Sequence, residues 1–423
     1  MRTQTRVSSK LKSKKVLAII VISALALLGL FLFLFNYMGF GSSPLQPGNS
    51  VFIDSSNQSE TNFETNFVDY ELEVFATGLR VPWSMVFTSP NRLLLTERPG
   101  RIRLIENGVL SENPLHTFPE VLNTDEEGLM GIALDPQYEI NQQLYVCIAY
   151  EKNFAEPSAS NTISSAVKVV RMTDAGTKLI DEQIIIDNIP VARFHAGCRL
   201  RFGPDNKLYI STGDASNKES AQDLNSLSGK ILRVNADGSI PADNPFPNSA
   251  IFSYGHRNPQ GFDWHPESGV LVATEHGPSG NDGPRGGDEV NIIEAGNNYG
   301  WPIVSHEKSQ EGLINPLILF TPAEAPGSGM FYRGSVFPQF TNTFLFGVLR
   351  GEGIIQVVFD DNAVGKVVSY QKLPDINVGR VRDIVEAPDG TIYFSTSNTD
   401  GRGQVYEGDD HIYRLIPKNN NLP

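Results

Sequence analysis

A repeated unit of short strand, turn and second strand constrains the fold of this chain more than any other feature. Six units follow one another, and their first strands are predicted at Leu93–Glu97, Leu144–Tyr150, Leu208–Thr212, Val270–Thr274, Phe344–Leu349 and Ile392–Thr396. Their second strands are predicted at Ile102–Ile105, Val167–Arg171, Ile231–Val234, Glu289–Ile293, Ile354–Phe359 and His411–Ile416. The turn-to-strand signature recurs as DNKLYIST and DGTIYFST, a pattern typical of strands that follow tight turns.

The units repeat every roughly 45 to 70 residues, the length that a four-stranded propeller blade needs. None contains a convincing amphipathic helix, and 38 glycines with 27 prolines indicate many turns. We therefore predict an all-β fold, a six-bladed β-propeller over residues 70–418. A strand near Glu71–Ala76 is expected to complete the last blade and close the ring. A β-sandwich is the alternative, but six similar units favour a ring.

The N-terminal region has a different composition from the propeller. Residues 1–15 carry six basic side chains and no acidic one, and Val16–Phe35 is twenty residues without a charge. A helix of that length spans about 30 Å, the thickness of a bilayer core. We predict a basic cytoplasmic tail (1–15), a transmembrane anchor (16–36), a flexible linker (37–69) and a body outside the cytoplasm. Cleavage of the apolar segment as a signal peptide is the alternative.

Charge and cysteine content exclude some classes of function. The formal net charge is −14, and because residues 1–15 are basic, the body is more acidic still. Such a body repels nucleic acid, so we expect no nucleic-acid partner. The two cysteines, Cys147 and Cys198, are too few for a disulfide framework, and the sequence leaves open whether they pair.

Candidate site residues lie on loops rich in glycine. The segment 251–302 surrounds the strand Val270–Thr274 with charged and glycine-rich loops, the way in which a rigid β-scaffold presents a site. His195 precedes a strand and is a candidate general base. Arginines fall in several predicted blades and together suit a polycarboxylate or phosphate ligand, namely Arg257, Arg350, Arg380 and Arg382. The sequence has no HExxH, GxSxG or GxxxxGK[ST] pattern, which disfavours a zinc hydrolase, a common esterase and a P-loop enzyme.

At this level of detail the chain resembles the soluble sugar dehydrogenases that depend on pyrroloquinoline quinone (PQQ), the glucose/sorbosone dehydrogenase family. The resemblance covers roughly Leu72 to Ile416 and rests on the segments LLLTERPGRIRLI, EGLMGIALDPQY, HAGCRLRFGPDNKLYISTGDA, GHRNPQG, EHGP, GDEVNII, GNNYGWP and GRVRDIVEAPDGTIYFST. It implies a six-bladed propeller, in agreement with the repeat count, and oxidation of an aldose at its anomeric carbon to a lactone.

The resemblance also implies roles for single residues. His195 is similar to the family's catalytic base, which takes the C1 hydroxyl proton while hydride moves to the quinone. Arg257, Asn258, Arg380 and Arg382 match its PQQ-contacting residues, and Arg350 stands where some members carry lysine. For calcium, which favours oxygen ligands, the implied ligands are the carbonyls of Gly277 and Pro278 beside the quinone, with Glu289 and Tyr299 at a second, structural site.

One position departs from the family pattern. Glu126 stands where many members carry glutamine, and a carboxylate beside a trianionic cofactor is expected to lower affinity unless it is protonated or turned away.

Two other functions are compatible with the sequence. One is a membrane-tethered propeller that binds glycans or protein without redox activity, since a fold alone proves no chemistry. The other is a calcium-dependent hydrolase of the lactonase type. The sequence names neither the sugar nor the electron acceptor.

Overall fold

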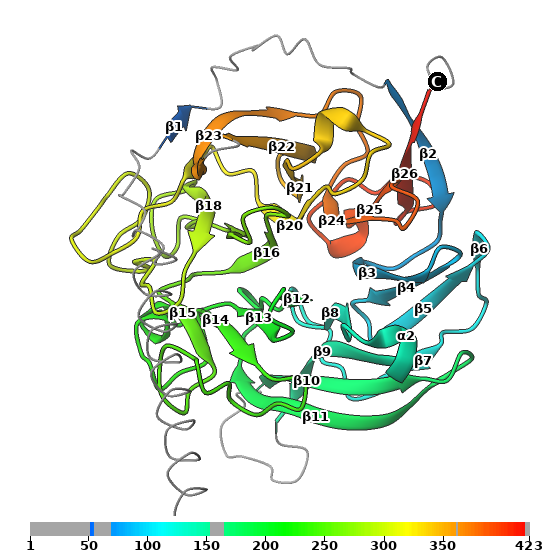
Figure 1. Cartoon of the computed structure of the whole chain (residues 1–423), viewed down its shortest axis with the longest axis horizontal. Coiled ribbons are helices and arrows are strands. Elements are labelled where there is room, and N and C mark those ends of the chain that lie inside the picture. Colours follow the sequence, from blue (N-terminus) through cyan, green and yellow to red (C-terminus); the bar gives the residue numbers. More distant parts are fainter. Residues whose placement is uncertain (1–50, 55–68, 153–164, 361–362, 419–423) are drawn as a thin grey trace, which may run out of the picture. The chain divides into compact units, whose positions relative to one another are not determined.

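The computed structural model describes residues 51–54, 69–152, 165–360 and 363–418. Its strands form six separate sheets arranged around a centre, antiparallel except for the pair β1–β19, which confirms the predicted six-bladed propeller (Figure 1). Within the described ranges no helix is both long and apolar enough to cross a bilayer. The predicted anchor, residues 16–36, lies outside those ranges.

The first three blades follow the chain in order. Blade 1 consists of β3 (Pro82–Ser89), β4 (Arg92–Glu97), β5 (Arg101–Glu106), β6 (Val109–Leu110) and β7 (His116–Thr117). Blade 2 consists of β8 (Leu129–Leu134), β9 (Gln143–Glu151), β10 (Ser165–Asp174) and β11 (Leu179–Pro190), with the short helix α2 (Tyr138–Asn141) between its first two strands. Blade 3 consists of β12 (Leu200–Phe202), β13 (Leu208–Thr212), β14 (Lys230–Val234) and β15 (Ile251–Tyr254), with η1 (Lys218–Ala221) before β14.

The last three blades include two strands from the beginning of the chain. Blade 4 consists of β16 (Pro259–Trp264), β17 (Leu271–Glu275), β18 (Asp288–Ile293) and β19 (Ile318–Thr321), and β1 (Val51–Asp54) pairs in parallel with β19. Blade 5 consists of β20 (Pro326–Phe331), β21 (Phe344–Val348), β22 (Gly353–Asp360) and β23 (Ala363–Lys372), with η2 (Pro338–Phe340) before β21. Blade 6 consists of β24 (Val381–Glu386), β25 (Ile392–Thr396), β26 (Ile412–Pro417) and β2 (Tyr70–Ala76), with η3 (Asn398–Asp400) after β25.

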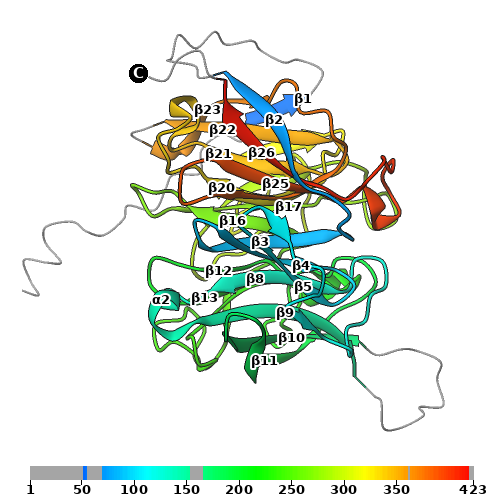
Figure 2. The same ribbon diagram turned by 90° about the vertical axis from the view of Figure 1, so that its right-hand side faces the viewer.

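The ring closes as predicted, by a strand from near the start of the body. β2 pairs antiparallel with β26, from Tyr70 opposite Pro417 to Ala76 opposite Ile412. Figure 2 shows β2 and β26 side by side. The segment expected to be a linker, 37–69, contributes one described element, the strand β1. Its parallel register with β19 adds a fifth strand to blade 4.

The cores lie between neighbouring blades. Strands in the middle of a blade, such as β13, are buried at every residue because a neighbouring blade covers each face. One core cluster joins blades 2 and 3 through Tyr145, Val169, Leu200 and Ile210. Cys147 and Cys198 form a disulfide inside this cluster, with their Cα atoms 6.4 Å apart, which settles the pairing that the sequence left open.

The first strand of every blade (β3, β8, β12, β16, β20 and β24) lies innermost, next to the centre of the ring (Figure 1). Innermost strands of successive blades contact one another, for example β16 with β20 and β24 with β3. Loops that enter these strands therefore converge at one end of the centre, although they are far apart in the sequence. This convergence places the candidate site.

Candidate functional site

A cavity of about 980 Å³ lies where the innermost strands begin. It is lined by most of the residues that the sequence analysis selected, namely Glu126, His195, Arg257, Gly277, Pro278, Arg350, Arg380 and Arg382. Asn258 lies beside it, since its Oδ1 accepts a hydrogen bond from the N–H of Gly197, which lines the cavity, at 3.2 Å. Glu289 and Tyr299 are not among the lining residues. The structure thus brings together residues from five blades or their connecting loops.

The most distinctive pair in the cavity is His195 with Asp214. Nδ1 of His195 lies 2.6 Å from Oδ1 of Asp214, whose side chain is buried. Because a carboxylate only accepts hydrogen bonds, Nδ1 is the donor, and in the neutral imidazole Nε2 then keeps its lone pair. The other oxygen of Asp214 accepts from Nε1 of Trp301 at 2.8 Å. Asp214 is therefore fixed from two sides, and it orients the imidazole so that Nε2 is the nitrogen without a partner in this pair.

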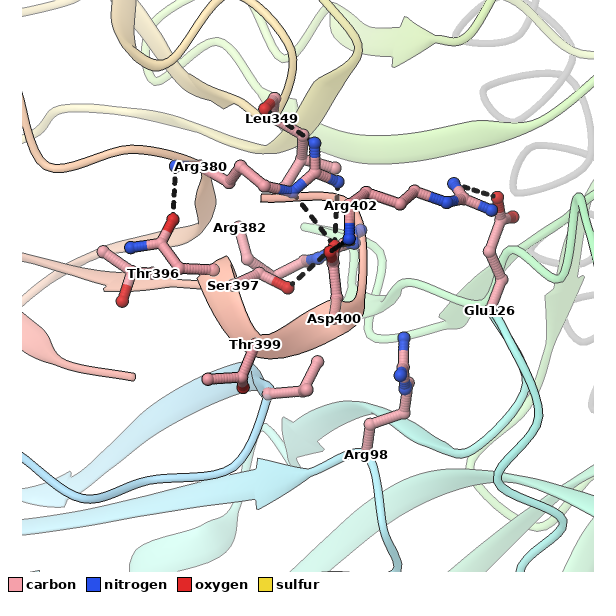
Figure 3. Close-up of polar contacts among 12 residues, drawn as sticks. Arg98, Glu126, Leu349, Arg380, Arg382, Thr396, Ser397, Thr399, Asp400 and Arg402 are labelled. Atoms are coloured by element: carbon pink, nitrogen blue, oxygen red, sulfur yellow. Dashed lines mark hydrogen bonds and ion pairs between the residues drawn. The ribbon is translucent and has the colours of Figure 1, made fainter. Parts of the chain in front are cut away.

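Asp400 binds two of the predicted arginines together (Figure 3). Its Oδ2 accepts from Nη2 of Arg380 at 2.8 Å and lies 3.8 Å from Nη2 of Arg382. Burial alone would raise the pKa of Asp400, but the two guanidinium groups outweigh it and lower that pKa. Burial lowers the pKa of Arg382 to about 10. A single carboxylate thus balances two buried cations, and the cavity wall keeps an excess of positive charge.

Two polar atoms of this wall have no hydrogen-bond partner among the described residues. They are Nδ2 of Asn258 and Nε of Arg382, both on buried side chains. A buried donor without an acceptor is costly, so both point to a ligand with acceptor atoms. The predicted contacts Arg257 and Arg350 also line the cavity. The guanidinium groups and the amide of Asn258 therefore fit a ligand that carries several carboxylates, such as PQQ.

The two glycine-proline carbonyls proposed for calcium lie on the cavity wall in a tightly packed loop. A Cβ at Gly277 would lie 2.3 Å from the carbonyl oxygen of Gly286 and 2.4 Å from that of Gly287. Pro278 accepts one long hydrogen bond, 3.2 Å, from the N–H of Gly286. Backbone oxygens are thus concentrated where the sequence predicts the first calcium ion, and such ligands suit that ion.

The second predicted calcium site lies on blade 4. Glu289 and Tyr299 both interact electrostatically with Glu275, and burial, then Glu275, raises the pKa of Glu289 to about 8. Glu275 has other partners as well, since its Oε2 lies 2.9 Å from Nδ1 of His256 and its Oε1 accepts from the N–H of Asn258 at 3.2 Å. The hydroxyl of Tyr299 is engaged, since it donates to the carbonyl of Ile292 and accepts from the N–H of Glu294. Within the described ranges, no three His, Cys, Asp or Glu side chains form a metal cluster.

Trp83 forms the inner boundary of the cavity. The guanidinium carbons of Arg382 and Arg199 lie 5.9 Å and 4.4 Å from the centre of its ring, respectively. Arg199 lines a second cavity, of about 520 Å³, together with the later residues of the innermost strands. Arg199 is held by Asp383 at 3.0 Å and by Oγ of Ser84 at 2.7 Å. Trp83, Arg199 and Asp383 therefore lie between the two cavities.

The sequence analysis missed several of these residues. Asp214 lies two residues after the predicted strand Leu208–Thr212, so a carboxylate near a strand end was a usable signal. Trp83, Trp301 and Asp400 gave no local signal. Their importance depends on partners from other blades, which only the closed ring brings within reach.

Comparison with known proteins agrees with this geometry. The family model "Glucose / Sorbosone dehydrogenase" matches residues 79–413. An aldose sugar dehydrogenase of Escherichia coli is 30% identical over 351 residues, with 78% of this chain and 91% of that protein covered. Quinoprotein glucose dehydrogenase B of Acinetobacter calcoaceticus is 30% identical over 437 residues, with 80% and 88% covered.

A solved structure gives the same result. The PQQ-bound form of aldose sugar dehydrogenase from Streptomyces coelicolor has a TM-score of 0.71 and 31% sequence identity, with 83% of this chain and 99% of that chain covered. The family match includes strands of all six blades, without β1, β2 and the end of β26, and it includes the His195–Asp214 pair. This chain belongs to the glucose/sorbosone dehydrogenase family.

Proposed function

We propose that this protein oxidises the anomeric carbon of an aldose sugar to the lactone, with PQQ as its redox cofactor. The observation that carries the proposal is the His195–Asp214 pair inside a cavity lined by arginines. Three named relatives support the assignment, since their names describe aldose or glucose dehydrogenases and one structure holds PQQ. A neutral sugar needs the base, and a tricarboxylic quinone needs the cations.

The residues that would hold PQQ are the arginines of the wall and the orphaned amide beside them. Arg257, Arg350, Arg380 and Arg382 offer guanidinium groups to carboxylates, and Nδ2 of Asn258 offers a further donor. When bound, PQQ would supply a quinone that accepts the hydride from C1 of the sugar, and with it both electrons of the oxidation.

His195 performs the proton transfer. Nε2 takes the proton of the C1 hydroxyl, and the C1–O bond becomes a carbonyl as C1 gives up its hydride. The imidazole becomes positively charged in this step, and Asp214, held by Trp301, stabilises that charge without moving. Base and counter-charge are thus in place before the sugar enters.

Calcium is part of the proposal at both predicted sites. The carbonyls of Gly277 and Pro278 would hold one ion beside the cofactor, where it would polarise the quinone. Glu289 and Tyr299 would hold the other, which would offset the charge of Glu275. An ion bound only to the folded state raises its stability, so chelation should lower the melting temperature. An unchanged melting temperature after chelation would remove both ions from the proposal.

One assay separates this function from its two alternatives. Purified protein reconstituted with PQQ and calcium should reduce an artificial electron acceptor when an aldose is added. Hydrolysis of a lactone without acceptor reduction would favour the lactonase-type hydrolase. Glycan or protein binding with neither reaction would favour the propeller without redox activity.

We also propose that the body lies outside the cytoplasm, attached to the membrane through residues 16–36. The support is the basic segment 1–15 followed by twenty uncharged residues. Protease added to right-side-out vesicles should digest the body and leave the tail protected. A body that resists until the membrane is lysed would reverse the orientation.

A further inference from the structure

The side chain of Arg402 reaches from blade 6 to Glu126. It belongs to the loop between η3 and β26, and its Nη1 lies 3.0 Å from Oε1 of Glu126, which precedes β8 (Figure 3). Both residues line the cavity. The two are 276 residues apart in the sequence, so only ring closure brings them together.

The second carboxylate oxygen of Glu126 contacts the backbone of His195. Oε2 accepts the backbone N–H of His195 at 2.8 Å. The φ angle of His195 is 60°, a left-handed conformation that residues other than glycine adopt only when their surroundings fix it. The carboxylate thus fixes the backbone of the residue whose ring Asp214 fixes.

The neighbouring residues strengthen this attachment. The N–H of Glu126 donates to the carbonyl of Arg193 at 3.0 Å, so the two segments exchange hydrogen bonds in both directions. The guanidinium carbon of Arg402 lies 5.4 Å from the ring centre of Phe194, the residue before His195. Arg402 therefore contacts both the acceptor of the His195 N–H and the residue next to it.

The charge of Glu126 is balanced within this group. Burial would raise the pKa of Glu126, but Arg402, then His276 and His195, outweigh burial and lower it. Both carboxylate oxygens are already engaged, one by Arg402 and one by His195. The sequence analysis expected a glutamate at this position to lower the affinity for an anionic cofactor. Because Arg402 and the N–H of His195 engage both of its oxygens, Glu126 does not have to repel such a cofactor.

We propose that Glu126 and Arg402 form a positioning pair for the base: together they fix the backbone of His195, and they do not contact the cofactor. This role rests on the proposed function, because it assumes that His195 is the base. It also predicts that the backbone amide of His195 is protected from hydrogen exchange in the cofactor-free protein. This property can be measured without an activity assay.

The test uses four variants of the full chain. Glu126→Ala removes the acceptor for the His195 N–H, whereas Glu126→Gln keeps an acceptor oxygen there and loses only the charge. Arg402→Ala keeps Glu126 but removes the guanidinium group that pairs with its Oε1. Arg414→Gln is the matched control, because Arg414 also pairs with a glutamate, Glu73, at 2.9 Å and lies over a phenylalanine ring, far from the cavity.

The expected pattern separates positioning from cofactor contact. In cofactor-free protein, amide hydrogen exchange in the peptide 193–198 should become at least about tenfold faster in Glu126→Ala, and less so in Arg402→Ala. The kcat of Glu126→Ala should fall by about 10- to 100-fold, the loss typical of a misplaced catalytic group. Glu126→Gln should restore most of that loss, and the KM and the Kd for PQQ should change less than about threefold. Arg414→Gln should match the wild type.

Two results would overturn the pair. One is tighter PQQ binding in Glu126→Gln with kcat unchanged, which would place Glu126 against the cofactor. The other is unchanged exchange and unchanged kcat in both alanine variants. If the wild type neither binds PQQ nor oxidises sugar while the exchange pattern holds, the proposed function fails, and the attachment of the His195 backbone is still supported.

Discussion

Asp214 determines which nitrogen of His195 is available for the proposed proton transfer, so its loss should have a specific effect. In Asp214→Asn the amide can donate to Nδ1, and the proton then moves to Nε2, where it blocks the base. We expect kcat to fall by about 10²- to 10⁴-fold, with PQQ still bound. His195→Gln should show a loss of similar size. Turnover close to normal in either variant would place the base elsewhere.

Lys230 is a buried residue of a different kind, with a structural task. Its Nζ donates to the carbonyls of Ser220, Ala221 and Ser228 at 2.8, 3.0 and 2.6 Å. These carbonyls belong to the segment that follows the cavity-lining residues 217–219. Lys230→Met leaves all three without this donor and should lower the free energy of unfolding by about 3 kcal/mol. Chemical denaturation measures the loss, and a change below about 1 kcal/mol would contradict this role.

The same residue makes stability depend on pH in a predictable direction. Burial lowers the pKa of Lys230 from 10.5 to about 8, so between these values the unfolded chain binds more protons than the folded one. Stability contributed by Lys230 therefore rises as pH increases from about 8 towards 10.5. The stability difference between wild type and Lys230→Met should grow over this range, and a difference that shrinks would contradict the shifted pKa.

Residue roles were predictable from the sequence only where the signal was local. His195 and the arginines stand in recognisable segments, and the structure places them in one cavity. Asp400 and Arg402 were missed because their roles depend on side chains of other blades. Glu126 was identified as unusual, but its partner lies at the far end of the chain.

At the scale of elements, the disulfide connects two blades close to the catalytic segment. Cys147 lies on β9, and Cys198 follows His195 by three residues. A cross-link across 51 residues restricts the unfolded chain by about 4 kcal/mol in the chain-entropy account. Replacement of both cysteines by alanine should therefore lower the free energy of unfolding by about 2–4 kcal/mol. Equal denaturation midpoints for wild type and variant would show that the bond does not stabilise the fold.

The two strands predicted in each unit were found, whereas the innermost strands (β3, β8, β12, β16, β20 and β24) were not predicted individually. The predicted Leu208–Thr212 and Ile392–Thr396 coincide with β13 and β25, and the other predicted strands differ from the observed ones by only a few residues. Alternation and turns are local properties, so they appear in the sequence. The strand β1 was not predicted, because VFID is short and lies in a polar segment. Its place is given by its partner β19, more than 250 residues later.

At the scale of the whole molecule, the ring depends on one strand from each end of the body. β2 supplies the outer strand of blade 6, and Glu73 on it forms an ion pair with Arg414 on β26. A chain that begins at Val81 lacks β2 and leaves an unpaired edge in blade 6. We expect it to melt at lower temperature and to aggregate more than a chain that begins at Asp69. Equal melting temperatures would show that closure contributes little.

The position of Trp83 between the two cavities has a consequence for the order of events in turnover. With Arg199 and Asp383 on its other side, the tryptophan lies between the two cavities. Under the proposed function, sugar and electron acceptor should then share one entrance, and the acceptor should reach the reduced site only after the product has left. Initial rates measured against sugar at several acceptor concentrations should therefore give parallel double-reciprocal lines. Trp83→Gly opens a second route, and intersecting lines in that variant alone would identify the tryptophan as the barrier that imposes this alternation.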